Sequence, residues 1–254
     1  MDYKIDVKRV QKRLLEMAVI VRDIFDRHDI PYFICAGTLL GALRNKGFIP
    51  WDDDFDLYCF DDYYDKALEA LNEELPKNMF LEYWGSEPNY FHSWAHVKDC
   101  NTICANEAYP QDACYTHKGL SVDIYRYVPM CQKDWPEFKL REAIKYIDAR
   151  LSKGFMSKEE YDQRRQQFQE QTIKRQSLVV DADAPMFGAA NSKFMQRREC
   201  ILPLSEVEFE GYVFKAPNHP NEFLTKVYGD YMKLPPESQR VPHYSDVIFN
   251  QLEL

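Results

Sequence analysis

The sequence predicts one α/β or α+β domain, in which helices flank a predominantly mixed β-sheet and a helical insert interrupts the fold. Its 254 residues suit one large domain, and the 45% hydrophobic content, with 17 Tyr and 16 Phe, is sufficient for a sizeable core. Helical and strand patterns alternate along the chain, as in mixed α/β architectures. We therefore expect residues 1–254 to form a single domain with a mainly helical insert at about 134–182.

The chain begins with a predicted helix and a buried strand. Apolar residues recur at helical spacing between charged residues, which predicts an amphipathic helix over residues 7–28. Pro31 interrupts this pattern, and the apolar run 32–36 predicts a buried strand that ends at Gly37 and Thr38. A short helix is expected over residues 39–45, starting from Thr38.

The remaining elements follow from the same apolar patterns and from the turn residues between them. Strands are predicted at residues 55–60, 79–84, 91–98, 102–105 and 120–128, with a strand or hairpin at 209–215. Helices are predicted at residues 62–75, 135–151, 158–180 and 218–228. The helix at 158–180 is dominated by Gln, Arg and Glu, so we expect it to lie on the surface or to act as a lid.

Charge and cysteine content exclude several classes of protein. The net charge of -9 does not suit a nonspecific nucleic-acid binder, so no nucleic-acid partner is expected. The absence of a signal-peptide pattern and of a membrane-spanning apolar run favours a cytoplasmic protein with reduced thiols. A zinc site built from Cys100, Cys104 and Cys114 with His96 or His117 is a weak alternative, because the spacing is not a standard one.

The stretch IPWDDDFDL, residues 49–57, places four aspartates within five positions. Along a strand, Asp54 and Asp56 point to the same side, while the apolar residues that alternate with them point into the core. Two neighbouring carboxylates need a counter-charge, and oxygen ligands favour Mg²⁺ or Mn²⁺. An acidic surface turn is the simpler alternative, and it is the interpretation that we keep for Asp52 and Asp53, which could also cap and position the turn.

Two further segments contribute to the predicted site. Asp123, within the strand-like run LSVDIYRYV, would complete a cluster of three carboxylates if its strand lies beside the first. Upstream, Gly37 and Thr38 follow a buried strand, where free backbone N–H groups and a hydroxyl suit a phosphate.

Three cationic residues are candidates for balancing phosphate charge. Arg44 and Lys46 lie shortly after the Gly-Thr pair in AGTLLGALRNKG. Lys98 lies on FHSWAHVKDC, where alternation places Trp94, His96 and Lys98 on one face of the predicted strand. For Lys98, a solvated strand end is an equally good interpretation.

The order of these motifs resembles a known superfamily. A buried strand, Gly-Thr, a short helix, an Asp-x-Asp pair and a later third Asp resemble the nucleotidyltransferases related to DNA polymerase β. The segments GTLLGALRNKGFIPWDDDFDL, GLSVDIY and APNHPNEFLTKVYGDYMKLPP closely resemble the LicD family, which includes bacterial phosphocholine transferases and relatives of fukutin-related protein. The resemblance covers residues 7–244, although segment 137–180 matches nothing diagnostic.

This resemblance implies a nucleotidyltransferase-like fold and a metal-dependent phosphotransferase that uses Mg²⁺ or Mn²⁺. The enzyme would move phosphocholine, or a similar phospho-substituent, from a CDP-linked donor such as CDP-choline and would release CMP. The acceptor would be a hydroxyl of a cell-surface glycan, such as lipopolysaccharide or teichoic acid, or of its lipid-linked precursor. By resemblance, Asp54 and Asp56 bind the metal, Asp123 is the third carboxylate, and Gly37 and Thr38 contact phosphate. Asp123 is also the candidate general base for the acceptor hydroxyl, or else only a ligand.

Several residues keep more than one interpretation. Asp230, in the C-terminal motif, is a candidate substrate contact, although docking of the tail explains the motif as well. His243 is either an acid or base or a surface histidine. Four aromatic residues could surround a choline group, although core packing explains each of them: Trp84, Tyr90, Trp94 and Tyr109.

Two other functions are compatible with the fold. An enzyme of this fold could make an NDP-linked donor by nucleotidyl transfer, but the complete LicD-like segments argue against that reaction. A non-catalytic module that binds a glycan or a partner would have no need of all three carboxylates, which are present. We therefore expect an enzyme in the cytoplasm, which could reach a lipid-linked acceptor at the inner face of the membrane by peripheral contact.

Overall fold

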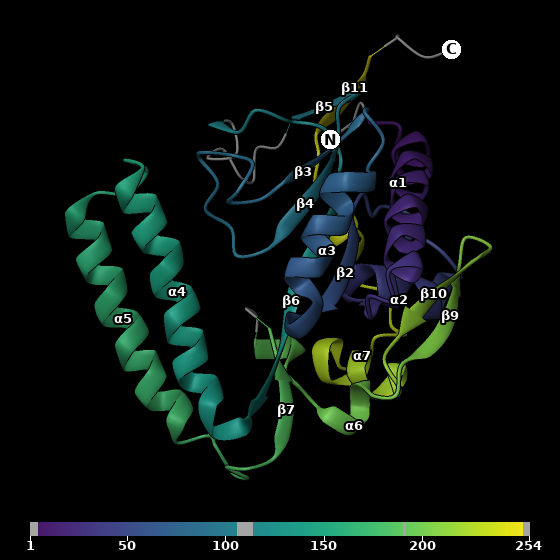
Figure 1. Ribbon diagram of the computed structural model, residues 1–254. Helices are drawn as coiled ribbons and strands as arrows, with labels where there is room; N and C mark the ends of the chain where they lie inside the picture. Colours follow the sequence, from purple (N-terminus) through teal and green to yellow (C-terminus); the bar gives the residue numbers. More distant parts are fainter. Residues whose placement is uncertain (1–4, 106–113, 190–191, 251–254) are drawn as a thin grey trace.

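A mixed β-sheet forms the centre of the fold (Figure 1). The computed structural model describes residues 5–105, 114–189 and 192–250. The main strands lie in the order β1 (Tyr32–Ile34), β2 (Phe55–Phe60), β6 (Ser121–Cys131), β4 (Ala95–Asp99) and β3 (Met79–Glu82). Strands β2 and β6 are parallel and the other neighbours are antiparallel, so the predicted mixed sheet is confirmed.

Shorter strands extend this sheet and form two small sheets beside it. They are β5 (Thr102–Ala105), β7 (Pro185–Gly188), β8 (Gln196–Arg197), β9 (Ser205–Phe209), β10 (Tyr212–Ala216) and β11 (Asp246–Phe249). The C-terminal half of β6 pairs with β7, and β7 pairs with β8. Strands β9 and β10 form the predicted hairpin, and β11, near the C-terminus, pairs antiparallel with β5.

Helices α1 (Val7–Arg27) and α3 (Asp61–Glu74) contact each other and strands β2 and β6, so they cover one face of the sheet. Helix α1 begins at Asp6, whose carboxylate accepts a hydrogen bond from the backbone N–H of Arg9 at 3.1 Å. Its apolar stripe is buried, as the helical spacing predicts. The core therefore lies between these two helices and the sheet.

Three further helices are α2 (Ala36–Asn45), which contacts β2, and α6 (Arg198–Ile201) and α7 (Pro220–Tyr228), which contact each other. Helix α2 ends at Lys46, whose φ of 62° is left-handed. A Cβ atom at Gly41 would lie 2.4 Å from the carbonyl oxygen of Gly47, so the chain can fold back here only over a glycine. This close turn directs the following segment toward β2.

The predicted insert is an antiparallel pair of helices, α4 (Trp135–Ser152) and α5 (Lys158–Gln176), that stands beside the sheet (Figure 1). Helix α5 buries only Tyr161 and Thr172 among its described residues, which confirms the predicted surface helix. It ends at Gln176 rather than at residue 180. The side-chain oxygen of Gln132 accepts hydrogen bonds from the N–H groups of Val180 and Asp181, so this stretch leaves the helical path.

Some strands are shorter than predicted. The strand predicted at 79–84 ends at Glu82, because the N–H of Tyr83 donates to the hydroxyl of Ser86 in a turn. The strand predicted at 91–98 begins only at Ala95. In the described part of the chain, no helix combines the length and the apolar character needed to cross a membrane.

Candidate active site

The parallel pairing of β2 and β6 brings two of the predicted carboxylates together. In this register Asp56 lies opposite Asp123, as predicted for neighbouring strands. Asp56 is buried, with 6% of its surface exposed, and no described residue donates a hydrogen bond to its carboxylate. The Asp123 carboxylate accepts hydrogen bonds from the hydroxyls of Ser121 at 2.9 Å and Tyr125 at 3.2 Å. Asp54 lies immediately before β2, two residues from Asp56.

The start of helix α2 holds the backbone of Asp56 from both sides. The N–H of Cys35 donates to the carbonyl oxygen of Asp56 at 3.1 Å, and the N–H of Asp56 donates to the hydroxyl oxygen of Thr38 at 2.9 Å. Gly37 and Thr38 lie inside the first turn of α2, which begins at Ala36 rather than at residue 39. Thr38 is buried and supports Asp56 directly, so its contact with a phosphate stays a prediction.

Gly37 makes room for an acidic side chain. A Cβ atom at this position would lie 2.6 Å from Oδ2 of Asp52 and 3.7 Å from Oδ1 of Asp54. Any larger residue would therefore push the Asp52 carboxylate away from its neighbours. The sequence indicated a phosphate-contacting role for Gly37, whereas the structure shows that it also lets two aspartates approach the helix terminus.

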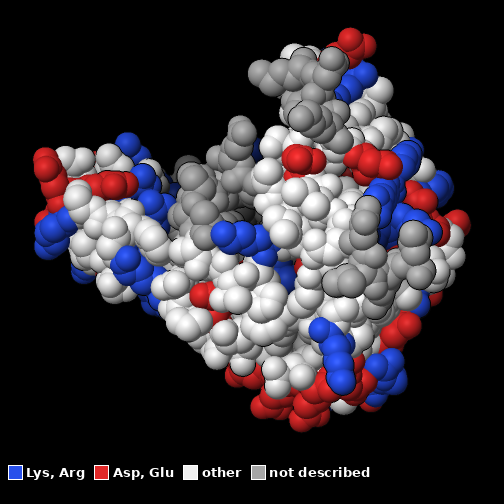
Figure 2. Space-filling view, turned by 90° about the horizontal axis from the view of Figure 1, so that it is seen from above, with Lys and Arg blue, Asp and Glu red and all other residues white. Residues whose placement is uncertain are grey.

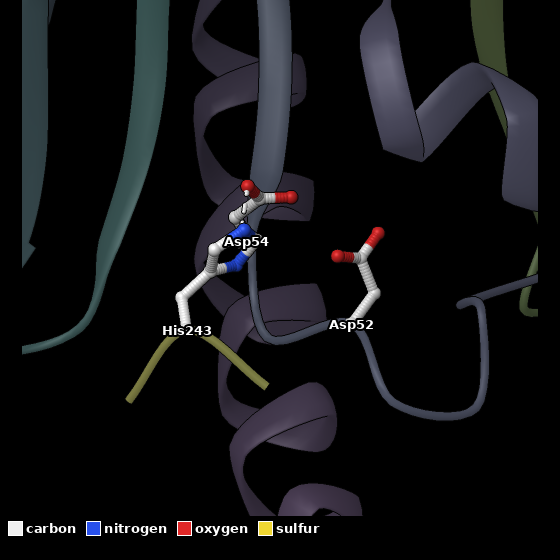
Figure 3. Close-up of side chains that lie close together, drawn as sticks. All are labelled: Asp52, Asp54 and His243. Atoms are coloured by element: carbon white, nitrogen blue, oxygen red, sulfur yellow. Dashed lines mark ion pairs between the residues drawn. The ribbon is translucent and has the colours of Figure 1, made fainter. Parts of the chain in front are cut away.

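Asp52, Asp54 and His243 form a cluster that the sequence did not predict (Figure 3). Among the described residues they are the group of three whose potential ligand atoms all lie within 4.8 Å of one another. The predicted trio of Asp54, Asp56 and Asp123 is more widely spaced than this. The sequence around Asp52 predicts a turn, and His243 follows about 190 residues later, so no local pattern connects the two residues.

Hydrogen bonds to Asp53 hold the C-terminal segment at this site. The buried Asp53 carboxylate accepts hydrogen bonds from the backbone N–H groups of His243 and Tyr244 and from Nδ1–H of His243, each at 2.9 Å. The same ring nitrogen lies 3.8 Å from Oδ2 of Asp54. Asp53 is thus neither a free surface residue nor a cluster ligand, but the group that positions His243.

The cluster carries more negative charge than its cations offset. Burial, followed by the charges of Asp54, Asp123 and Asp52, raises the pKa of Asp56 well above its ordinary value. Burial and the charge of Asp54 raise the pKa of Asp52 to about 8, with His243 and Arg44 acting in the opposite direction.

His243 is the cationic member of the cluster. Its hydrogen bond to Asp53 raises the pKa of the imidazole to about 9. The positive charge of His243 does not offset all the aspartates around it, and Asp56 has no cationic partner among the described residues. Burying a carboxylate without such a partner costs free energy. The donor set, which is mostly carboxylate oxygen, fits a divalent cation such as Mg²⁺ or Mn²⁺.

The predicted carboxylates line two cavities. We call the larger one, about 640 Å³, the hairpin cavity: it is lined by Cys35, Ala36 and Asp56 and by residues of α4 and α5. The smaller one, about 330 Å³, is the tail cavity, which is lined by Asp54, Asp123, His243 and Tyr244, among others. Trp94 and Tyr125 line both cavities and form the wall between them. Asp56 is thus accessible from the hairpin cavity, and Asp54 and Asp123 are accessible from the tail cavity.

The tail cavity contains the predicted face of strand β4. Trp94, His96 and Lys98 all line it, as their alternation predicts. The sequence did not identify Glu82, whose carboxylate is 3.0 Å from Nδ1 of His96, nor the 3.8 Å approach of His96 Nε2 to Asp123. Since the indole N–H of Trp94 donates to Nε2 at 2.8 Å, the His96 proton is on Nδ1.

The other predicted binding residues lie outside these two cavities. The Arg44 guanidinium donates to the carbonyl oxygen of Tyr231 at 3.1 Å and thereby ties α2 to the tail motif. Lys46 caps the C-terminus of α2, and Asp230 is exposed in the turn that follows α7. Their contacts with substrate stay predictions.

The alternatives for cysteine and aromatic residues are resolved in part. Six cysteines are free thiols, namely Cys35, Cys59, Cys100, Cys104, Cys131 and Cys200, and Cys100, Cys104 and Cys114 do not form a metal-ligand group with the described histidines. Of the proposed cage residues, Trp94 lines both cavities, whereas the Tyr90 hydroxyl is buried against the carbonyl oxygen of Trp94. Trp84 lines a neighbouring cavity, and Tyr109 lies outside the described residues.

Comparisons with known proteins identify the family of the chain. The chain is 29% identical over 272 residues to the lipopolysaccharide cholinephosphotransferase LicD of Haemophilus influenzae, an alignment that covers 95% of this chain and 97% of the relative. A segment is 40% identical over 50 residues to an uncharacterised protein of Rickettsia typhi, covering 18% of this chain and 16% of the relative. The sequence profile of the LicD/FKTN/FKRP nucleotidyltransferase domain matches residues 29–174, which include β2, β6 and the three predicted carboxylates. The chain belongs to the LicD/FKTN/FKRP family of nucleotidyltransferase domains.

Proposed function

We propose that the protein transfers phosphocholine, or a similar substituted phosphate, from a CDP-linked donor to a hydroxyl of a cell-surface glycan or its lipid-linked precursor. The full-length similarity to a lipopolysaccharide cholinephosphotransferase supports this reaction. The observation that carries the proposal is the cross-strand pair Asp56 and Asp123, in which a buried carboxylate has no described cation of its own. Such an arrangement suits a reaction that needs a divalent cation next to a pyrophosphate.

The chain's own groups would divide the work as follows. Asp54, Asp56 and Asp123 would hold Mg²⁺ or Mn²⁺, with Asp52 and His243 beside them. When bound, the cation supplies positive charge that neutralises the donor phosphates and the leaving CMP. The N–H groups in the first turn of α2, next to Ala36, would donate to the same phosphates. The residues would therefore provide both a cation site and a phosphate site.

Asp123 is our candidate for the general base. Its carboxylate lines the tail cavity, where an acceptor hydroxyl could donate its proton to it. Hydrogen bonds from Ser121 and Tyr125 fix the orientation of the carboxylate. The donor would occupy the hairpin cavity and the acceptor the tail cavity, so the two substrates would meet at the carboxylates.

Product analysis tests the reaction and separates it from its main alternative. The protein would be incubated with Mg²⁺, a lipooligosaccharide acceptor and, in turn, CDP-choline, CDP-ethanolamine, CDP-glycerol and CDP-ribitol, and followed by phosphorus NMR. We expect one donor to yield CMP and a new phosphodiester on the acceptor.

The family's description as a nucleotidyltransferase domain favours one second candidate, the synthesis of an NDP-linked donor. That reaction would instead consume CTP and release pyrophosphate.

We also propose that the protein acts in the cytoplasm, at the inner face of the membrane, where a lipid-linked acceptor would be within reach. A peripheral contact would be sufficient for this purpose. Comparison of a lipid-linked acceptor in vesicles with its soluble glycan fragment tests the idea. Equal activity on the soluble fragment would contradict it.

A further inference from the structure

The hairpin cavity is positively charged, although the protein as a whole is acidic. Its lining contains five cations and three carboxylates, whereas the whole chain carries a net charge of -9. The cations are Arg126, Lys139, Arg141, Lys145 and Arg175, and the last four come from the α4–α5 insert. Figure 2 shows the insert projecting to one side of the body, with both basic and acidic side chains on its surface. This cavity is therefore suited to an anion.

Two of the five cations have partners within the cavity. Arg126 donates to Asp61 at 2.7 Å, and the Lys145 ammonium lies 2.9 Å from Glu142. Lys139, Arg141 and Arg175 have no carboxylate ion pair in the described part of the chain. These three positive charges are available to a ligand.

Lys139 on α4 and Arg175 on α5 line the same cavity. Both are partly buried, and burial followed by the charge of Arg175 lowers the pKa of Lys139. The Arg175 guanidinium is held over the ring of Trp135, 5.9 Å from its centroid, and donates to the side chain of Gln171 at 3.0 Å. Holding two like charges together costs free energy unless an anion lies between them.

The neighbouring surfaces indicate which anion fits. The cavity reaches Asp56 and the first turn of α2, where the donor phosphates would lie under the proposed function. Trp94, Tyr125, Phe138 and Phe194 provide ring faces in the same cavity, and its volume of about 640 Å³ suits a nucleotide. A phosphate carried by the acceptor alone would have no use for these rings.

We propose that the α4–α5 insert is part of the donor site and that Lys139 and Arg175 bind the phosphates of the donor's nucleoside diphosphate in the hairpin cavity. This inference rests on the proposed function for the identity of the donor. It gives a role in ligand binding to a segment whose second helix the sequence predicted only as a surface helix or a lid. It also places the phosphate-binding cations on the insert rather than at Arg44, Lys46 and Lys98.

Calorimetric binding of CDP, in the presence of Mg²⁺, tests the proposal without turnover. Lys139→Met and Arg175→Met should each weaken CDP binding about tenfold or more, which corresponds to the loss of a charge-assisted contact. Lys174→Met is the matched control, because Lys174 neighbours Arg175 but does not line the cavity, and it should bind CDP within about twofold of the wild type. Lys139→Arg should restore most of the affinity. Cytidine, which has no phosphate, should bind equally to all variants.

The outcomes separate this inference from the proposed function. Wild-type affinity for CDP in both Met variants, with unchanged thermal melting, would overturn the inference even if the wild type releases CMP from a CDP-linked donor. A higher KM for the acceptor with an unchanged KM for the donor would also overturn it. If CDP binding depends on Lys139 and Arg175 but no donor is turned over, the inference stands and the proposed reaction fails.

Discussion

The described residues provide no counter-charge for the Asp56 carboxylate when it is ionised. It is buried opposite Asp123, and burial and neighbouring aspartates raise its pKa. A carboxylate in such surroundings destabilises the protein until a cation binds. The unpaired Asp56 carboxylate thus lowers stability, and we propose that the same carboxylate binds the cation used in transfer.

Asp56→Asn should therefore stabilise the metal-free protein while removing its response to metal. In EDTA we expect the free energy of unfolding to rise by about 1 to 2 kcal/mol, because a nearly isosteric neutral group replaces an unpaired carboxylate. Mg²⁺ should raise the melting temperature of the wild type and leave that of Asp56→Asn unchanged. Thermal melts of both proteins with EDTA and with Mg²⁺ measure this. A variant that is less stable in EDTA would contradict the account of Asp56.

His243 should contribute to stability in a pH-dependent way. Its pKa is raised to about 9 in the folded protein, above the ordinary value of 6.5, so its contribution is complete below pH 6.5 and is lost as the pH rises through 9. Its side chain is 55% exposed, so solvent screening reduces the contribution to about 1 kcal/mol.

Urea unfolding of the wild type and His243→Ala measures this contribution. The experiment is done in EDTA, because a bound cation would compete for the same carboxylates. The difference in the free energy of unfolding should be about 1 kcal/mol near pH 6 and close to zero near pH 10. An equal difference at the two pH values would show that the imidazolium charge is not what stabilises this contact.

At the scale of elements, the junction between α2 and β2 is the part of the site that depends most on backbone geometry. The first turn of α2 holds Asp56 through Cys35 and Thr38, and Gly37 leaves room for Asp52. Strand β2 has the bounds predicted from its apolar pattern, which shows that local sequence determines this element. Helix α2 begins earlier than predicted, because Ala36 adopts a left-handed conformation, with φ of 48°, that no sequence pattern indicates.

Gly37→Ala should affect metal binding more than folding. The added Cβ would meet Oδ2 of Asp52 at 2.6 Å, and this flexible carboxylate can rotate away. The helix preference of Ala would offset part of the cost, so the free energy of unfolding should change by less than about 1 kcal/mol. We expect Mg²⁺ affinity, measured by calorimetry, to fall about tenfold, as it does when a ligand is displaced from a metal site. Unchanged affinity would show that Asp52 takes no part in the site.

At the scale of the whole molecule, the site is assembled from segments that are distant in the sequence. The sequence predicted Asp54, Asp56 and Asp123 from strand alternation and from the family resemblance, and the register of β2 and β6 bears out the pairing of Asp56 with Asp123. It could not predict the role of Asp53, since its partners His243 and Tyr244 follow about 190 residues later. The cations of the insert were also unrecognised, because Lys139 and Arg175 are brought together only by the packing of α4 on α5.

We propose that the aspartates at the N-terminal ends of β2 and β6 hold the cation on which transfer depends. Release of CMP from the preferred CDP-linked donor, measured against Mg²⁺ concentration, tests it most directly. We expect the wild type to depend on Mg²⁺, and Asp54→Asn, Asp56→Asn and Asp123→Asn each to lose at least about a hundredfold in rate. Asp65→Asn, on the exposed face of α3, is the control and should retain wild-type activity. Full, Mg²⁺-independent CMP release by Asp56→Asn would contradict the claim.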